Sequence, residues 1–380
     1  MLQSIIVYTL TGFILHALGR NLALRDARMQ RTFHRPTSFW CTEIWLSILV
    51  FAIVAGLRYN VGVDHLMYLQ FYEDMTKQGW ITRETLEPGF SFIMKVFTEL
   101  NLHFFFFFAF LAAIQITFIY YSFRNNKYIL PYIGLFIMLG PYFLDWMNGI
   151  RQCIAMCIFV LSIEFIQKRK FILYILTIFG ASLIHKSAYI LLPFYFIFFK
   201  SFSPSKTKTH LLILILCIIL GNSPTWISSI TSLNNFFIFL GYENYVNNFE
   251  NVLDNLKEFA WGPRRISVLL INFIIIYLYP QINQFYYNNK NVPLYFNLFF
   301  IGVCLYNLLA NTSLEFLRPV SYFTIFTLPM SAYTAHYLKI QKSKMFYLLF
   351  IILVCSYSYL SVFSTSDPHN TIWYKFFFDY

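Results

Sequence analysis

The segment from Asn148 to Phe165 reads NGIRQCIAMCIFVLSIEF. From Cys153 onward its residues are almost all apolar, and a helix of this kind can cross the hydrocarbon core of a bilayer, which takes about 20 residues. Arg151 enters the first turn of this helix, where the helix dipole favours anions over cations. That conflict disappears when an anion lies beside Arg151. The segment therefore predicts a membrane-spanning helix that holds an anion at its start.

The composition of the whole chain is that of a membrane protein. Of its 380 residues, 58% are hydrophobic and only 12% are charged, whereas a soluble domain carries about 25% charged residues. A soluble enzyme is therefore excluded. The apolar runs predict an all-α polytopic fold with about twelve transmembrane helices in one integral membrane domain, residues 1–380. The predicted spans are 2–18, 39–57, 103–123, 128–144, 150–167, 171–184, 187–199, 209–229, 265–280, 293–311, 319–338 and 345–363.

Two of these spans, 171–184 and 187–199, are too short to cross a bilayer untilted. The residues around His185 that join them form either the tip of a hairpin or a break in one long helix. A hairpin sorts most Lys and Arg residues to one side with few acidic residues, as the positive-inside rule expects of the cytoplasmic side. We therefore favour the hairpin. It places the long loops 58–102 and 230–264 on the outer side of the membrane.

Charge and cysteine usage limit the partners. The formal charge of +11 would suit nucleic acid, but in a multispanning protein a basic excess more often marks cytoplasmic loops. We expect no nucleic-acid partner; the lipid bilayer is the expected surrounding. The six cysteines lie in apolar segments without a Cys-x-x-Cys pair, and the histidines are scattered. We therefore expect no disulfide, no metal site and no cofactor.

The predicted topology gathers a set of polar residues at the outer face. Its members are Arg58, Asp64, Tyr68, Glu87, Arg151, Gln152, His185, Arg318 and Tyr322. A guanidinium can hold two phosphate oxygens at once, and the free amides at a helix start add to such a site. Three arginines at one interface therefore suit a pyrophosphate. For each arginine alone, the alternative is an interfacial side chain that snorkels to the lipid headgroups.

Two members of the set are candidates for a general base. Gly62 permits a turn that would bring the Asp64 carboxylate back toward the membrane surface, where it could accept a proton from an attacking hydroxyl. The alternative is that Asp64 caps the helix that begins at His65. His185 lies at the expected hairpin tip and could act as a base or as a hydrogen bonder to sugar or phosphate. Its alternative is a cap of the hairpin.

Five short motifs resemble, in order, those of the EpsG-like group of Wzy-type polymerases. They are GLRYNVGVD at 56–64 with Tyr68, EPGF at 87–90, NGIRQ at 148–152 with Ala155, HKSA at 185–188, and Arg318 with Tyr322 and Phe323. The similarity covers residues 56–323. It has two departures, because Val63 stands where the family has a small hydroxyl residue and His65 where it has an aromatic residue.

This resemblance implies a membrane-embedded glycosyltransferase of the GT-C type at the periplasmic face of the bacterial inner membrane. Its substrate would be an undecaprenyl-diphosphate-linked oligosaccharide, and its product O-antigen, capsule or exopolysaccharide built from the repeat units. A chain-length regulator protein is a candidate partner. The resemblance assigns two roles to the polar set. Catalysis would belong to Asp64 or His185, and diphosphate or sugar binding to Arg58, Arg151, Arg318, Gln152, Tyr68, Glu87 and Tyr322.

Other functions fit parts of the pattern. An O-antigen ligase-type glycosyltransferase needs the same donor at the same face. A flippase for lipid-linked oligosaccharides should line a central cavity with charged residues and often shows repeated halves, whereas here the polar set gathers at one face. A membrane acyltransferase, or a scaffold for the polysaccharide assembly machinery, completes the alternatives. A scaffold would tolerate single polar substitutions on that face.

Overall fold

The protein is all-helical wherever its structure is described. The computed structural model describes residues 1–79, 86–197, 207–231, 261–312, 314–341, 344–363 and 371–379, and in these ranges the only strand-like pairing is an isolated antiparallel bridge between Arg58 and Phe376. The chain divides into two compact units. Unit 1 comprises Met1–Lys200 and Ser331–Tyr380, and unit 2 comprises Ser201–Met330. The all-α class is confirmed for the described residues, and the single membrane domain stays a prediction.

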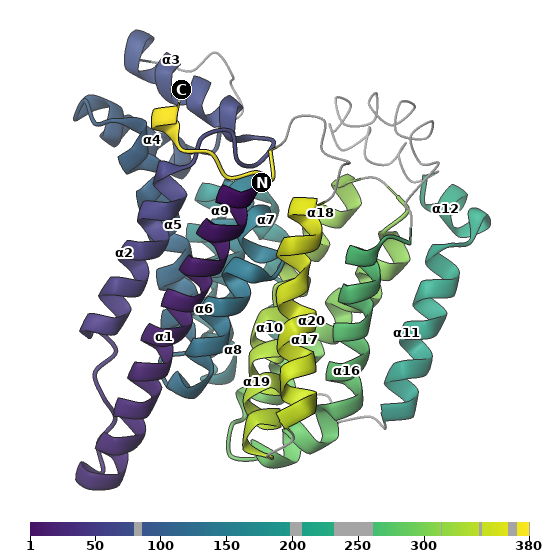
Figure 1. The fold of residues 1–380 in the computed structure, drawn as a ribbon. Coiled ribbons are helices and arrows are strands. Elements are labelled where there is room, and N and C mark those ends of the chain that lie inside the picture. Colours follow the sequence, from purple (N-terminus) through teal and green to yellow (C-terminus); the bar gives the residue numbers. More distant parts are fainter. Residues whose placement is uncertain are drawn as a thin grey trace. The chain divides into compact units, whose positions relative to one another are not determined.

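Each unit is a set of helices labelled in Figure 1. Unit 1 contains α1 (Leu2–Phe33), α2 (Thr42–Leu57), α3 (His65–Gln78), α4 (Pro88–Glu99), α5 (Phe104–Ser122), η1 (Lys127–Ile129), α6 (Leu130–Leu139), α7 (Tyr142–Asn148), α8 (Ile150–Gln167), α9 (Phe171–Ile184), η2 (Lys186–Leu191), α10 (Phe194–Ile197), α20 (Lys344–Phe363) and η4 (Phe377–Asp379). Unit 2 contains α11 (Thr207–Gly221), α12 (Pro224–Thr231), α16 (Pro263–Phe285), α17 (Asn291–Leu309) and α18 (Leu314–Thr324). Helix α19 (Thr327–Ile340) crosses the boundary at Ser331.

The described residues contain fewer candidate membrane spans than the sequence suggested. Six described helices, α1, α5, α8, α16, α17 and α20, are long and apolar enough to cross a bilayer, and a seventh span results if one bent pair of helices counts as one. The polytopic helical prediction is therefore confirmed, but the count of about twelve is not supported. Loop 230–264 lies mostly outside the described residues, whereas loop 58–102 contains α3 and α4.

Helix length explains the discrepancy. The apolar runs at 39–57, 171–184 and 209–229 fold into helices of only 16, 14 and 15 residues, shorter than the roughly 20 residues that a span requires. The run at 128–144 bends by 60° between the helix that ends at Leu139 and the next, α7. Hydropathy counts apolar residues, but it does not count the turns and caps that shorten a helix.

The hairpin centred on His185 is confirmed. The Tyr174 hydroxyl in α9 donates to the Leu191 carbonyl oxygen at 2.6 Å, and the rings of Phe171 and Tyr195 lie 5.0 Å apart. The start of α9 thus contacts the end of the next segment, so the chain doubles back at His185.

Small residues allow close helix packing in unit 1. A side chain at Gly19 in α1 would lie 2.7 Å from the Pro131 nitrogen of α6, and one at Gly56 in α2 would lie 2.8 Å from the Phe105 carbonyl oxygen of α5. Such contacts replace the hydrophobic effect as the source of helix association in lipid. They pack α1 against α6 and α2 against α5. Both chain termini lie at the same end of unit 1 (Figure 1).

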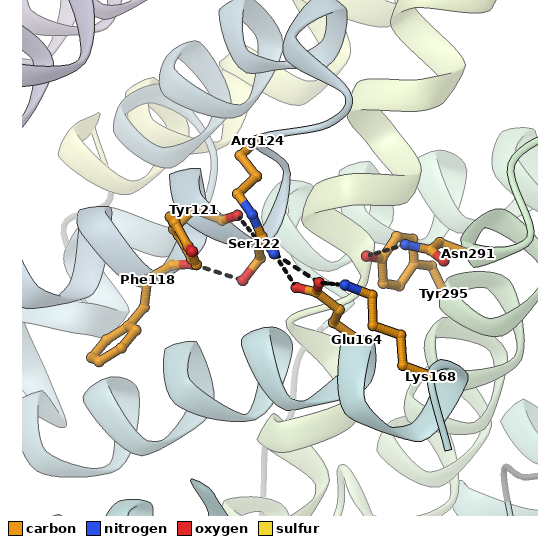
Figure 2. Close-up of polar contacts among 8 residues, drawn as sticks. All are labelled: Phe118, Tyr121, Ser122, Arg124, Glu164, Lys168, Asn291 and Tyr295. Carbon is orange, nitrogen blue, oxygen red and sulfur yellow. Dashed lines mark hydrogen bonds and ion pairs between the residues drawn. The ribbon is translucent and has the colours of Figure 1, made fainter. Parts of the chain in front are cut away.

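Ion pairs join helices at the opposite end of unit 1. Figure 2 shows Arg124 and Lys168 both reaching Glu164 near the end of α8, with Arg124 Nη2 2.7 and 2.6 Å from the two carboxylate oxygens. A more buried pair joins Lys127 to Asp26 of α1 at 3.0 Å, and Asp26 also accepts the Thr37 backbone N–H at 2.7 Å. These contacts hold the polar extension of α1 against the start of α6.

Replacing Lys127 with Met should destabilise unit 1, because the Asp26 carboxylate would stay buried without its cation. The side chains of Lys127 and Asp26 are only 5% and 10% exposed, so we expect a loss of about 3 kcal/mol. Thermal unfolding in detergent measures it. Lys168→Met is the control, because its side chain is 54% exposed and exposed pairs contribute at most about 1 kcal/mol. Equal melting temperatures for the two variants would contradict the account.

Candidate functional site

The loop that follows α2 docks against the end of α7. Gly62 has a φ of +89°, and a side chain there would lie 2.7 Å from the Met147 carbonyl oxygen. The backbone N–H of Asp64 donates to Asn148 Oδ1 at 3.1 Å. Only glycine combines this backbone conformation with so close an approach. The loop thereby holds Asp64 beside the residues that directly precede Arg151 in the chain.

The Glu87-Pro88-Gly89 turn docks in the same way against the hairpin tip. A side chain at Gly89 would lie 2.7 Å from the Leu183 carbonyl oxygen, so α4 begins in contact with the end of α9. Pro88 is the first residue of α4, a position where its missing N–H costs no helical hydrogen bond. Glu87, which precedes it, accepts the backbone N–H of Lys186 through Oε1 at 3.1 Å.

Arg151, Glu87 and Tyr68 form one cluster. Arg151 Nη1 makes an ion pair with Glu87 Oε2, and Arg151 Nε donates to the Tyr68 hydroxyl at 3.3 Å. The guanidinium also lies 5.8 Å from the ring centres of Tyr68 and Phe90. The Arg151 and Glu87 side chains are 17% and 6% exposed. The arginine placed against its helix dipole thus has a protein carboxylate as its first partner.

This cluster leaves part of Arg151 available. Its Nε and Nη1 are engaged, and Nη2 makes no hydrogen bond to any residue that the structure describes. Arg151 lies in the first turn of α8, where backbone N–H groups have no carbonyl one turn earlier in the helix. An anion can therefore meet a fixed guanidinium fork and a helix start together.

The base candidates flank this cluster. His185 follows α9 in an extended conformation, with Nδ1 2.6 Å from Ser187 Oγ, and it is half-buried. Asp64 is the residue before α3, but its side chain does not make the capping hydrogen bond, so the capping alternative is not supported. Burial raises the pKa of Tyr68, and the Asp64 charge adds to that shift. Gln152, also half-buried, adjoins Arg151 in α8.

Arg58 is buried at the start of the loop that follows α2. Its side chain is 1% exposed, its Nη1 donates to the Ala55 carbonyl oxygen, and its guanidinium lies 4.8 Å from the Phe108 ring centre. Its Nε and Nη2 have no hydrogen-bond partner in the described part of the chain. Burial lowers its pKa to about 10. A guanidinium enclosed in this way does not snorkel to lipid headgroups.

Arg318 and Tyr322 belong to unit 2, whereas the other predicted residues belong to unit 1. Both lie on α18, where the Arg318 side chain is exposed and Tyr322 is fully buried. Their convergence with Arg151 stays a prediction. Across the described ranges, no group of three or more His, Cys, Asp or Glu side chains could hold a metal ion.

The sequence did not indicate that the chain's last residues pack against the site. Residues Thr371–Asp379 form the C-terminal segment. The Tyr59 backbone N–H donates to the Lys375 carbonyl oxygen at 2.8 Å, and the Gly62 N–H donates to the Thr371 carbonyl oxygen at 2.9 Å. The C-terminal segment therefore pairs with the loop that carries Arg58 and Asp64. The one sequence signal was its aromatic content, which is equally typical of a membrane interface.

His65 should make the stability of unit 1 depend on pH. It is fully buried, both ring nitrogens lack a partner among the described residues, and burial with the nearby Arg58 charge lowers its pKa to about 2. The unfolded chain protonates this residue near pH 6.5 and the folded protein does not. Stability is therefore full above pH 6.5 and falls by about 1.4 kcal/mol per unit as the pH drops below it.

Replacing His65 with Phe should remove this dependence, because Phe keeps the ring and cannot be protonated. Unfolding curves of both proteins in detergent between pH 7 and pH 5 provide the comparison. The variant should gain on the wild type steadily as the pH falls. Parallel curves would show that His65 is accessible to protons in the folded state.

Comparison with known protein families assigns the chain to a family. The family model of the EpsG family matches residues 44–378, which include every residue of the polar set. No curated protein and no solved structure matches the chain. The match covers most of the chain, and the helices are long and apolar enough for a multi-pass membrane protein. The chain therefore belongs to the EpsG family and is a membrane protein of polysaccharide biosynthesis.

Proposed function

We propose that this protein is a GT-C-type glycosyltransferase that joins undecaprenyl-diphosphate-linked oligosaccharide repeat units into O-antigen, capsule or exopolysaccharide. The reaction would occur at the periplasmic face of the bacterial inner membrane. The observation that carries the proposal is Arg151, a guanidinium fixed by Glu87 and Tyr68 at the start of an apolar helix. Its unused Nη2 and the adjacent helix start suit the diphosphate of such a donor.

In this proposal the acceptor hydroxyl of a new lipid-linked repeat attacks the anomeric carbon of the growing chain. The bond between that carbon and the diphosphate oxygen breaks, and undecaprenyl diphosphate leaves with the electron pair. Arg151 stabilises the charge that develops on the leaving group, with Arg58 assigned to the same diphosphate. The diphosphate is already a good leaving group, so positioning and charge stabilisation contribute most of the catalysis.

Glu87 and Tyr68 act in this scheme by holding Arg151. Two of the guanidinium nitrogens are occupied, so the plane of the side chain is set before the donor arrives. A preorganised donor group does not have to reorganise as charge develops. Glu87 also balances the charge of Arg151 in the empty site, which lowers the cost of holding a cation where little water reaches.

The proton of the acceptor hydroxyl passes to His185 or Asp64. The contact between His185 Nδ1 and Ser187 Oγ orients the imidazole. As a general base, the imidazole would take the proton on the ring nitrogen that carries none. Asp64 is half-buried next to Asn148 and has a carboxylate that caps no helix. Gln152 is assigned to sugar contacts, and a chain-length regulator to the periplasmic surface.

Arg151→Ala should abolish polymerisation in a strain that lacks the chromosomal gene. We expect a surface-glycan gel with a single repeat unit attached and no ladder, because each guanidinium contact to a diphosphate contributes at least tenfold in rate. Arg124→Ala is the matched control, since Arg124 also pairs with a glutamate and is about equally exposed. It should retain the ladder.

Extraction of lipid-linked intermediates from the same strains separates the rival functions. A full ladder with Arg151→Ala would overturn the assignment. Loss of every attached repeat with long lipid-linked chains would mean a ligase. Single lipid-linked units trapped on the cytoplasmic face would mean a flippase.

A further inference from the structure

Two helices of unit 2, α11 and α17, pack side by side. The His210 ring of α11 lies 4.6 Å from the Phe300 ring of α17, measured between ring centres. Further along both helices, a side chain at Gly221 would overlap the Asn307 carbonyl oxygen. The Asn311 side-chain amide also donates to the Gly221 carbonyl oxygen at 2.8 Å. Residue numbers rise in both helices from the first contact to the second, so the two helices run in the same direction.

Cys217 and Cys304 lie between these contacts. Cys217 comes one turn before Gly221 in α11, and Cys304 comes one turn after Phe300 in α17. Residues one turn apart share a helix face, so both thiols lie on the faces that meet. The two side chains interact as a hydrogen-bonding pair. We expected no disulfide from the sequence, because these two cysteines lie far apart in it and form no spacing motif.

The two thiols differ in how easily a reagent reaches them. Both are free, but Cys217 is buried with 8% of its surface exposed, whereas Cys304 is half-buried. Neither lies at the middle of its helix. Cys217 is about 6 Å from the end of α11 and Cys304 about 8 Å from the end of α17, at 1.5 Å per residue. An accessible thiol beside a buried one suits stepwise disulfide exchange, in which the first attacks and the second resolves.

We propose that Cys217 and Cys304 form a dithiol site that a disulfide oxidant converts, reversibly, to a disulfide between α11 and α17. The Cys304 sulfur attacks the oxidant's disulfide, one oxidant thiol leaves, and a mixed disulfide forms. The Cys217 sulfur then attacks the Cys304 sulfur, and the second oxidant thiol leaves. Each cysteine gives its proton to one departing thiolate, and the two electrons pass to the oxidant, whose S–S bond is exchanged for that of the protein.

This disulfide would hold the helix against which α18 packs. A side chain at Gly302 of α17 would lie 2.6 Å from the Phe323 carbonyl carbon of α18. Helix α18 carries Arg318 and Tyr322. In the topology that the sequence predicts, the ends of α11 and α17 near the thiols lie on the outer side of the membrane, and the bacterial periplasm keeps thiols oxidised. The pair therefore acts as a clamp on unit 2 under oxidising conditions.

Oxidation of the wild-type protein tests the proposal without any substitution. The full-length protein in phosphatidylcholine nanodiscs is treated with dithiodipyridine, a disulfide that enters lipid, and its peptides are then mapped by mass spectrometry without reductant. We expect Cys217 and Cys304 to be joined in most of the protein and to be released by dithiothreitol. Cys153 and Cys157 are the internal control, because both are buried in α8 and should stay thiols.

Serine variants separate the roles of the two thiols. Cys217→Ser should keep a stable thiopyridyl adduct on Cys304, because no second thiol resolves it. Cys304→Ser should leave Cys217 as a free thiol, because the buried sulfur does not reach the oxidant first. Cys355→Ser is the matched control, since it removes a buried cysteine of unit 1. It should form the disulfide as the wild type does.

Contrary outcomes are equally distinct. A wild-type protein that keeps a stable adduct on Cys304, or whose Cys217 stays a thiol, would overturn the proposal. Oxidation should also raise the melting temperature of the wild type by about 5 °C or more, but not that of Cys304→Ser. Equal shifts in the two proteins would contradict the clamp. The proposed sugar transfer uses neither thiol, so either proposal can fail without the other.

Discussion

The ion pair between Arg151 and Glu87 holds the candidate site together. It joins the start of α8 to the residue before α4, and the same carboxylate accepts the Lys186 N–H next to the hairpin tip. Through the Tyr68 hydroxyl it also engages α3. Both charges are largely buried, so removing either one leaves the other unpaired and strongly destabilises the fold. Each surrounding loop is shaped to let this pair form, with Gly62 and Gly89 permitting the close backbone contacts.

A second pair, Arg124 with Glu164, shows why the first differs from a structural brace. Glu164 lies about 20 Å from Arg151 along α8, at 1.5 Å per residue. Arg124 uses Nη1 for the Tyr121 carbonyl oxygen, Nη2 for both Glu164 oxygens, and its face for the Tyr121 ring (Figure 2). Arg151 keeps Nη2 without a described partner and stands at a helix start. The two arginines have similar exposure, but they differ in which guanidinium nitrogens are engaged. Only Arg151 suits an incoming anion.

Local patterns in the sequence predicted much of this. The apolar run after Arg151 predicted a helix over residues 150–167, and the structure has the same bounds. The sorting of charged residues predicted the hairpin at His185, which the structure also shows. Contacts between distant residues were not predictable. Glu87 and Arg151 are joined by the packing of Gly89 on Leu183, and the bridge from Arg58 to Phe376 joins residues far apart in the chain. The count of about twelve spans is not supported among the described residues, because hydropathy does not register the bend after Leu139 or the shortness of α9.

The central claim is that the Arg151 fork holds a diphosphate. Native mass spectrometry of the purified protein with undecaprenyl diphosphate tests it most directly, comparing Arg151→Lys with Arg124→Lys. Both changes keep the positive charge and remove the planar fork. The account predicts at least tenfold weaker retention of the lipid by Arg151→Lys and wild-type retention by Arg124→Lys. Equal retention by the two variants would contradict it.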